Sequence, residues 1–183
     1  MQKVVLSEIS LIYGEVKTPK GFEIDRIKLK NNIISSFIKE NRVSKNNKDY
    51  SYQDYQVTFS QPLQWLKDYI RDHFKAEHSF QLVEKLDFGV ILNPKEKSFL
   101  RNHVDPVDLR HSPDYTCIYV VECEKDSCEL IIEYDDNRRK GRTWHIPLNN
   151  NCFYIFPSIQ KYFISENKSK KINIFLTSTY EYI

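Results

Sequence analysis

Hydrophobic and polar residues follow a helical period in part of the first half of the chain. Ser60 is a favourable N-cap and Pro62 suits the first turn after it. The apolar side chains that follow fall on one helix face, at Leu63, Leu66, Ile70 and Phe74. We therefore expect a helix over Ser60–Ala76 that packs this stripe against the outside of a sheet.

A second helix is predicted from about Leu29 to Val43, on three apolar positions at helical spacing, Ile33, Phe37 and Ile38. Other parts of this half are predicted to be extended, namely Lys3–Leu6, Ile9–Tyr13 and, by its alternation, Phe22–Asp25. The polar stretch Ser44–Tyr55 is predicted to be a loop.

After Glu84 the pattern changes to short apolar runs separated by turns. Seven strands are expected, at Lys85–Leu92, Tyr115–Val121, Glu129–Tyr134, Thr143–Ile146, Cys152–Phe156, Tyr162–Ser165 and Ile172–Ser178. Regularly spaced short strands favour a sandwich or jelly roll, and helices followed by strands indicate the α+β class. We expect a single domain over 1–183, with N-terminal strands and support helices in 1–84 and the β core in 85–178.

The composition fits a packed domain and excludes some partners. The 183 residues are 40% hydrophobic, and the net charge is only +2 in a chain that is 28% charged. Acidic and basic residues are interleaved, so no nucleic-acid-binding face is expected. The basic run around Arg138–Arg142 fits a solvated loop. No apolar run is long enough to cross a membrane.

The four cysteines, Cys117, Cys123, Cys128 and Cys152, contain no CxxC pair of the kind that zinc sites use. Cys117 and Cys152 lie in apolar runs, where a free thiol behaves as a small buried hydrophobic group. No signal peptide follows Met1, so we expect reduced thiols and a cytoplasmic protein, or one carried in a virion.

His103-Val104-Asp105 is the pattern with the clearest chemistry. Side chains alternate along a strand, so an HxD pair at a strand end places its imidazole and its carboxylate on one face. These two groups are two-thirds of the facial triad that non-heme Fe(II) oxygenases use. Taken alone, the triplet also fits a surface histidine beside a turn-forming Asp-Pro.

The residues that follow this triplet strengthen its interpretation as part of a metal site. An aromatic-containing strand with Tyr119 follows, and then the turn Phe156-Pro157-Ser158. Over roughly Asp87 to Ser178, the chain resembles the 2-oxoglutarate/Fe(II) oxygenase superfamily. The likeness is to its small prolyl-hydroxylase-like branch, common in marine bacteria and their tailed phages. The resemblance implies a double-stranded β-helix (jelly-roll) core with the N-terminal helices packed outside, and it makes His103 and Asp105 metal ligands.

This chain differs from the pattern of that branch at two positions. The branch has its distal histidine ligand four residues after the serine of the turn, where this chain has Tyr162. Its arginine for the far carboxylate of 2-oxoglutarate is replaced by Lys171, a point charge without the bidentate fork. A phenol must ionise to bind metal well. His145 and His111 are the other histidines considered for the empty role, and neither is favoured by its place in the chain.

We therefore expect a degenerate site with His103, Asp105 and Tyr162 at the metal position and with Tyr119 and Lys171 at the cosubstrate position. The favoured function is a non-catalytic jelly-roll protein that binds protein partners in a larger assembly, such as the neck, tail or capsid of a tailed phage. No cofactor is expected in that case. The alternative is an active dioxygenase that uses Fe(II) and 2-oxoglutarate.

Overall fold

The computed structural model describes residues 9–17, 22–41, 53–78, 81–137 and 139–183. Its helices are α1 (Phe22–Asn41) and α2 (Gln61–Glu77), with a short 3-10 helix at Leu109–His111. Its strands are β1 (Ile12–Glu15), β2 (Gln53–Gln56), β3 (Leu82–Leu92), β4 (Tyr115–Glu122), β5 (Glu129–Asn137), β6 (Lys140–Pro147), β7 (Cys152–Pro157), β8 (Lys161–Ile164) and β9 (Asn173–Tyr182).

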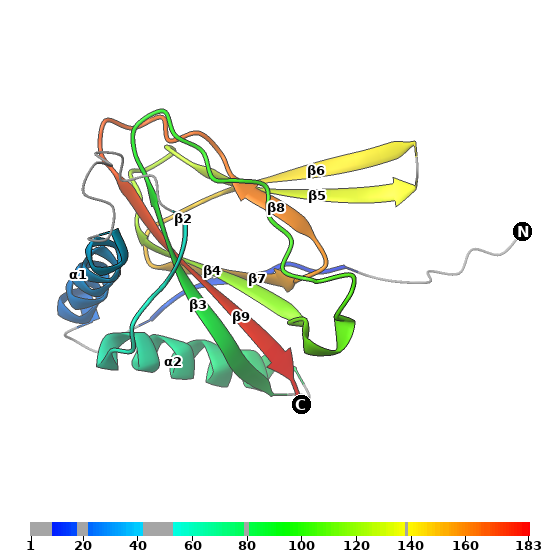
Figure 1. The fold of residues 1–183 in the computed structure, drawn as a ribbon, viewed down its shortest axis with the longest axis horizontal. Helices are drawn as coiled ribbons and strands as arrows, with labels where there is room; N and C mark the ends of the chain where they lie inside the picture. The colour runs from blue at the N-terminus through cyan, green and yellow to red at the C-terminus, as the bar shows by residue number, and fades with distance from the viewer. Residues whose placement is uncertain (1–8, 18–21, 42–52, 79–80, 138) are drawn as a thin grey trace, which may run out of the picture.

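The strands form two antiparallel sheets, which confirms the predicted α+β jelly roll. The large sheet has the order β1-β7-β4-β9-β3-β2, and the small sheet has the order β6-β5-β8. Figure 1 shows the helices on one side of the large sheet and the small sheet on the other side, with β5 and β6 extending away from the body. Arg101 adds one further bridge to the small sheet, opposite Tyr162.

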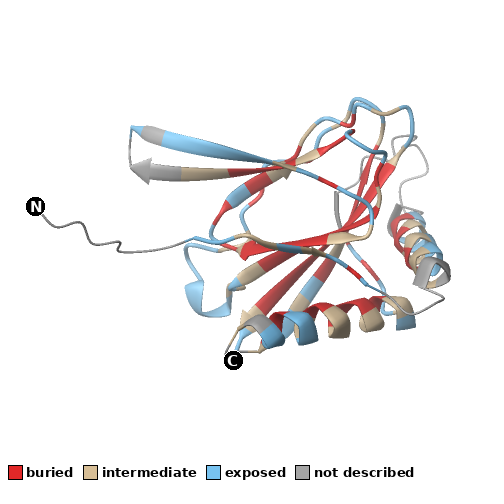
Figure 2. Cartoon of the chain, turned by 180° about the vertical axis from the view of Figure 1, so that it is seen from behind, coloured by how far each residue is buried: buried red, intermediate tan, exposed pale blue. Residues whose placement is uncertain are grey.

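Two hydrophobic clusters share the large sheet. On β4, Cys117, Tyr119 and Val121 belong to the cluster beneath the helices. Ile118 and Val120 belong to the cluster that faces the small sheet. The alternation follows from the two-residue period of a strand. Figure 2 shows the same arrangement as buried central strands and a buried stripe along the inner side of α2.

Helix α2 matches its sequence pattern. Ser60 has extended backbone angles and accepts a hydrogen bond from the backbone N–H of Leu63, as an N-cap does. The apolar stripe is buried in the cluster beneath the helices, at Leu63, Leu66, Ile70 and Phe74. Neither helix of the described chain is long and apolar enough to cross a membrane.

Two local predictions are wrong. Phe22–Asp25 is the first turn of α1 and not a strand, because the helical spacing of buried Leu29, Ile33 and Phe37 extends the helix backwards past a four-residue alternation too short to compete. Tyr55 was assigned to a loop but lies in β2, paired with Gly89 of β3. The predicted strand at Lys3–Leu6 and the loop residues 44–52 lie outside the described residues.

Candidate functional site

His103 and Tyr162 meet between the two sheets. Arg101 and Tyr162 pair as backbone neighbours, with hydrogen bonds of 2.8 Å from Arg101 N–H to Tyr162 C=O and of 3.0 Å in the reverse direction. This pairing brings the residues after Arg101 to the start of β8. There His103 Nε2 lies 2.8 Å from the hydroxyl oxygen of Tyr162, across 59 positions of sequence.

Aromatic rings surround this pair. The His103 ring stacks on Phe88 of β3, with ring centres 6.0 Å apart and planes 12° apart. Phe156 of β7 meets the Tyr162 ring edge-on at 5.1 Å. Tyr162 is 2% exposed and belongs to the cluster between the sheets. The pair is therefore set in a mostly apolar wall.

This burial fixes the protonation of both groups. Burial and, to a smaller extent, the nearby Arg101 charge together lower the pKa of His103 to about 4. Burial raises the pKa of Tyr162 to about 12, although the Arg101 charge and the Thr177 hydroxyl act in the other direction. At neutral pH a neutral phenol and a neutral imidazole therefore share one hydrogen bond, and its direction depends on the imidazole tautomer.

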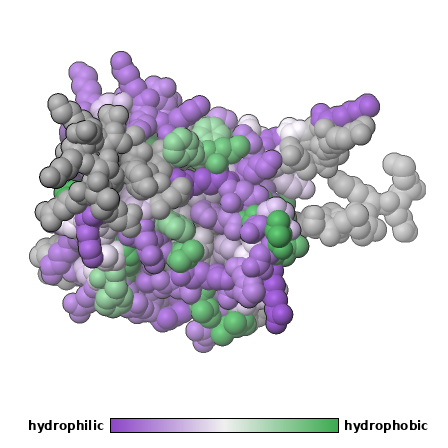
Figure 3. All heavy atoms as spheres, in the orientation of Figure 1, coloured by the Kyte–Doolittle hydropathy of each residue, from purple (hydrophilic) through white to green (hydrophobic). Residues whose placement is uncertain are grey.

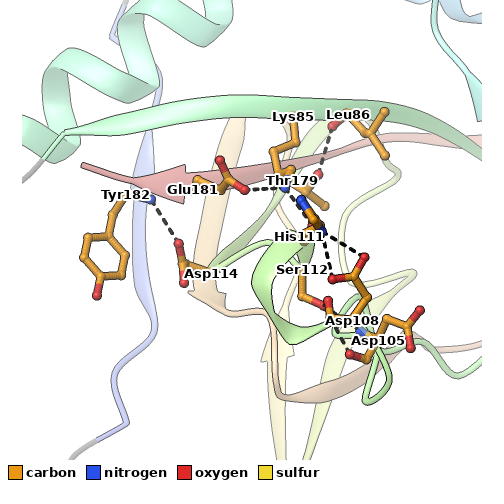
Figure 4. Close-up of polar contacts among 10 residues, drawn as sticks. All are labelled: Lys85, Leu86, Asp105, Asp108, His111, Ser112, Asp114, Thr179, Glu181 and Tyr182. Carbon is orange, nitrogen blue, oxygen red and sulfur yellow. Dashed lines mark hydrogen bonds and ion pairs between the residues drawn. The ribbon is translucent and has the colours of Figure 1, made fainter.

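Asp105 takes part in a different set of contacts. It is exposed, its carboxylate accepts a 2.9 Å hydrogen bond from the backbone N–H of Val107, and its own N–H donates to Ser112 Oγ at 2.8 Å. Figure 4 shows Asp105 and Ser112 within this surface loop, beside Asp108 and His111. These contacts make Asp105 a turn-stabilising residue of the loop, as its Asp-Pro sequence allows.

The other two histidines considered for the metal position are held by carboxylates outside the barrel. His111 Nδ1 lies 2.8 Å from an Asp108 oxygen, and both side chains are exposed. The hydrogen bond with His111 lowers the pKa of Asp108. His145 Nδ1 lies 3.2 Å from Glu129, also at the surface. Within the described ranges, no group of three or more His, Cys, Asp and Glu side chains is arranged to hold a metal ion.

The two residues predicted for the cosubstrate lie apart from His103. The Tyr119 hydroxyl donates to Asn151 Oδ1 at 2.8 Å, and its ring is in the cluster beneath the helices. It therefore lies on the opposite face of β4 from the side chains around Tyr162. Lys171 is exposed in the turn before β9, where its backbone bonds to Ser169 and Asn167.

An apolar cavity of about 290 Å³ lies next to the pair and was not predicted. Phe156 and Ile132, the latter directly opposite Tyr162, form part of its wall. The rest of the wall comes from Ile9, Ser10, Leu11, Trp144, Ile146 and Gln160. The alternation of Trp144 and Ile146 around His145 was the available signal, because it places both side chains on one face of a strand.

The sequence and the fold can be compared with those of known proteins. No protein-family model matches the sequence, and no curated protein sequence matches it either. Solved structures do match. The non-heme alpha-ketoglutarate-dependent carbocyclase SnoK from nogalamycin biosynthesis has a TM-score of 0.64 and 6% identity, over 94% of this chain and 79% of its own. A Pseudomonas putida prolyl-4-hydroxylase has a TM-score of 0.62 and 12% identity, over 93% and 91%.

This chain has the fold of the 2-oxoglutarate/Fe(II) oxygenases. The viral collagen prolyl hydroxylase of Paramecium Bursaria Chlorella virus-1 agrees, with a TM-score of 0.59 and 12% identity over 92% of this chain and 94% of its own. In this oxygenase fold, Tyr162 is the second residue of β8, and His103 contacts it from the segment that follows the Arg101 bridge. Identities this low show the fold, and a fold alone does not give a reaction.

Proposed function

We propose that this protein is a non-catalytic jelly roll with an oxygenase fold, which acts as an interaction protein in a larger assembly such as a tailed-phage virion. The observation that carries the proposal is the hydrogen bond between Tyr162 and His103 Nε2. In this arrangement the ring nitrogen that would bind a metal is engaged in a hydrogen bond with a neutral phenol instead.

The residues present do not fit the Fe(II) site of the oxygenases. Fe(II) favours imidazole and carboxylate ligands around open positions. The Tyr162 phenol, with a pKa of about 12, is a poor substitute for an imidazole at neutral pH. Asp105 is exposed and its carboxylate supports its own loop.

The residues expected to hold 2-oxoglutarate fit no better. Tyr119 lies on the other face of β4, and the Lys171 side chain is exposed before β9. The wall between the sheets is largely hydrocarbon, as at Ile118 and Val120, with the Thr177 hydroxyl and the Arg101 charge beside Tyr162. A dicarboxylate placed there would lose most of its hydration, with Arg101 as the cation beside it.

The surface around His103 and Tyr162 supports a binding role. The segments that lead into and out of these two residues expose five large apolar side chains, Phe99, Leu100, Val107, Leu109 and Ile159. Figure 3 shows separate apolar patches on an otherwise hydrophilic face. Exposed apolar patches rimmed by polar residues are typical of protein interaction sites. The neighbouring cavity of about 290 Å³ has room for an apolar side chain of a partner.

An active Fe(II)/2-oxoglutarate dioxygenase is the second candidate. It is favoured by the convergence of His103 and position 162 in a barrel of the oxygenase fold. In that case His103 and Asp105 would hold Fe(II), after a rearrangement of the Asp105 loop.

The two functions predict different results with purified protein, Fe(II), 2-oxoglutarate and oxygen. We expect the wild type to form succinate no faster than a His103→Ala variant, because the described residues include no competent ligand set. We also expect Tyr162→His to bind Fe(II) or Co(II) at least about tenfold more tightly than the wild type, since imidazole is the better ligand. Titration calorimetry under argon measures this affinity.

A Tyr162→Phe variant is the matched control, because it removes the hydroxyl without adding a ligand nitrogen. Succinate formation by the wild type that depends on His103 would overturn the proposal and establish the dioxygenase.

A further inference from the structure

Cys123 and Cys128 stand on either side of a tight turn that connects the two sheets. The turn, Glu124–Ser127, is closed by a 3.1 Å hydrogen bond from Ser127 N–H to Glu124 C=O. Asp126 has a φ of 58°, in the left-handed region common in such turns. The ends of a β-turn lie less than about 7 Å apart, so the two residues just outside it face each other.

The backbone groups of these cysteines bond to a third segment, and their thiols hydrogen-bond to each other. Cys123 N–H donates to Asn150 Oδ1, and Cys128 C=O accepts from Leu148 N–H at 3.1 Å. Both groups thus bond to the segment before β7 and not across the turn. Two thiols that hydrogen-bond to each other lie close enough for a disulfide to form after a small side-chain movement.

The two thiols lie in one buried polar cluster. Asn173 Nδ2 donates to Cys128 Sγ at 3.2 Å and to Ser127 Oγ at 2.9 Å. Cys123 Sγ lies 3.3 Å from the same Ser127 hydroxyl. Cys123 is 3% exposed and Cys128 1%, whereas Glu124, Lys125 and Asp126 above them are exposed.

The contacts within this cluster give the two thiols different pKa values. Hydrogen bonds from Cys123, and then from Asn173 and Ser127, lower the pKa of Cys128 to about 7 against the effect of burial, and the Lys168 charge adds to this. The pKa of Cys123 is raised by its hydrogen bond with Cys128 and by burial. Cys128 is thus the better nucleophile and Cys123 its neighbouring thiol.

We propose that Cys123 and Cys128 form an oxidisable dithiol that closes to an intramolecular disulfide when the protein meets a peroxide. The Cys128 thiolate attacks one peroxide oxygen, the O–O bond breaks, and a sulfenic acid and hydroxide result. Cys123 sulfur then attacks Cys128 sulfur, the S–O bond breaks, and the Cys123 proton leaves with the hydroxyl group as water. Hydrogen peroxide is reduced by two electrons, and the dithiol is oxidised by two.

The disulfide would act on the connection between the sheets. The turn joins β4 of the large sheet to β5 of the small sheet. It also bonds to the segment before β9, through Lys168 N–H to Ser127 C=O at 3.0 Å, and to the first residue of β9, through Glu124 N–H to Asn173 Oδ1 at 3.2 Å. A covalent link here restrains the unfolded chain and raises the melting temperature of the oxidised form.

Intact-mass spectrometry of the folded protein after treatment with hydrogen peroxide tests this inference. We expect a loss of two hydrogen atoms that dithiothreitol reverses, and peptide mapping that links residue 123 to residue 128. Cys123→Ser and Cys128→Ser should each abolish the mass loss. Cys117→Ser and Cys152→Ser are the matched controls and should retain it, because Cys117 lies in the cluster beneath the helices and the Cys152 thiol lies beside Tyr154 and Glu15.

Three results would overturn the inference. One is a folded wild type that keeps four reduced thiols under conditions that oxidise the urea-unfolded chain. Another is a disulfide that maps to Cys117 or Cys152. The last is stable over-oxidation of Cys128 without disulfide formation. The wild-type peptide map decides the question even if a serine variant fails to fold.

Discussion

At the residue scale, position 162 determines which partner His103 has. A phenol offers the imidazole a hydrogen-bond donor, whereas a second imidazole would offer another ligand nitrogen beside it. The 2.8 Å contact joins the two side chains within an apolar wall that includes Phe88 and Phe156. Because both groups are neutral at pH 7, the pair needs no counter-ion there.

The low pKa of His103 predicts an acid-sensitive fold. Folding lowers this pKa from 6.5 to about 4, so between these pH values the unfolded chain binds more protons than the folded chain. Stability should fall as the pH drops through this window, by up to about 3 kcal/mol from this residue alone. Urea unfolding from pH 7 to pH 4 measures it, and His103→Gln should show a shallower decline. Parallel curves for the two proteins would contradict this assignment.

Gly89 is a second residue on which the fold depends. A Cβ atom placed there would lie 2.3 Å from the Tyr55 ring carbon Cζ and from its hydroxyl oxygen. Tyr55 is fully buried and packs edge-on against Phe37, with ring centres 5.6 Å apart, so it has little room to move. Gly89→Ala should cost about 1–3 kcal/mol of unfolding free energy in urea titrations, the usual range for overpacking.

Gly14→Ala is the control for this prediction, because a Cβ there meets only the edge of the Phe153 ring at 3.1 Å. Combining Gly89→Ala with Tyr55→Val should cost less than the sum of the single changes, since removal of the ring frees the space. Strict additivity would show that the clash is not the cause.

At the element scale, α2 is fastened to the large sheet by charge as well as by its apolar stripe. Lys67 is 7% exposed, and its Nζ contacts Glu84 and lies 3.0 Å from Asp87 Oδ2. Ser178 of β9 donates to the other Asp87 oxygen at 2.6 Å. Burial, together with a hydrogen bond from the protonated Glu84 carboxyl to Asp87, raises the pKa of Glu84 to about 7. The helix thus brings one cation to a pair of carboxyl groups beneath it.

Removing the Lys67 charge should lower the free energy of unfolding. Lys67→Met leaves the Asp87 carboxylate buried without its ion pair, and we expect a loss of about 3 kcal/mol or more of stability. Lys75→Met, an exposed lysine of the same helix, is the matched control and should change stability by less than about 0.5 kcal/mol. Denaturant titrations compare the two. Equal small losses would show that the buried pair adds nothing to the docking of α2.

At the scale of the whole molecule, the large sheet separates the two hydrophobic clusters. Its central strands are buried on both faces, by the helices on one side and by the small sheet on the other. The sequence of such a strand is a continuous apolar run, as in Cys117–Val121. The strands of the N-terminal part, β1 and β2, complete the two edges of this sheet.

The sequence by itself determined the helix α2, the approximate position of the seven later strands and the α+β class. These features follow from local periodicity, caps and turns, which neighbours in sequence control. The positions of His103 and Tyr162 came from a resemblance, and the structure brings the two side chains into contact. The metal and cosubstrate roles assigned to the five predicted residues stay predictions.

Only the tertiary structure decided the rest. A strand buried on both faces has two apolar sides, so its pattern could not tell that Tyr119 points toward the helices and away from His103. The four-residue alternation at Phe22–Asp25 gave way to a longer helix stabilised by its contacts with the sheet. Three further features depend on contacts between residues that are far apart in the chain. They are the burial of Lys67, the cavity beside Phe156 and the cluster around Cys128. Long-range packing sets such contacts, and local periodicity carries no information about them.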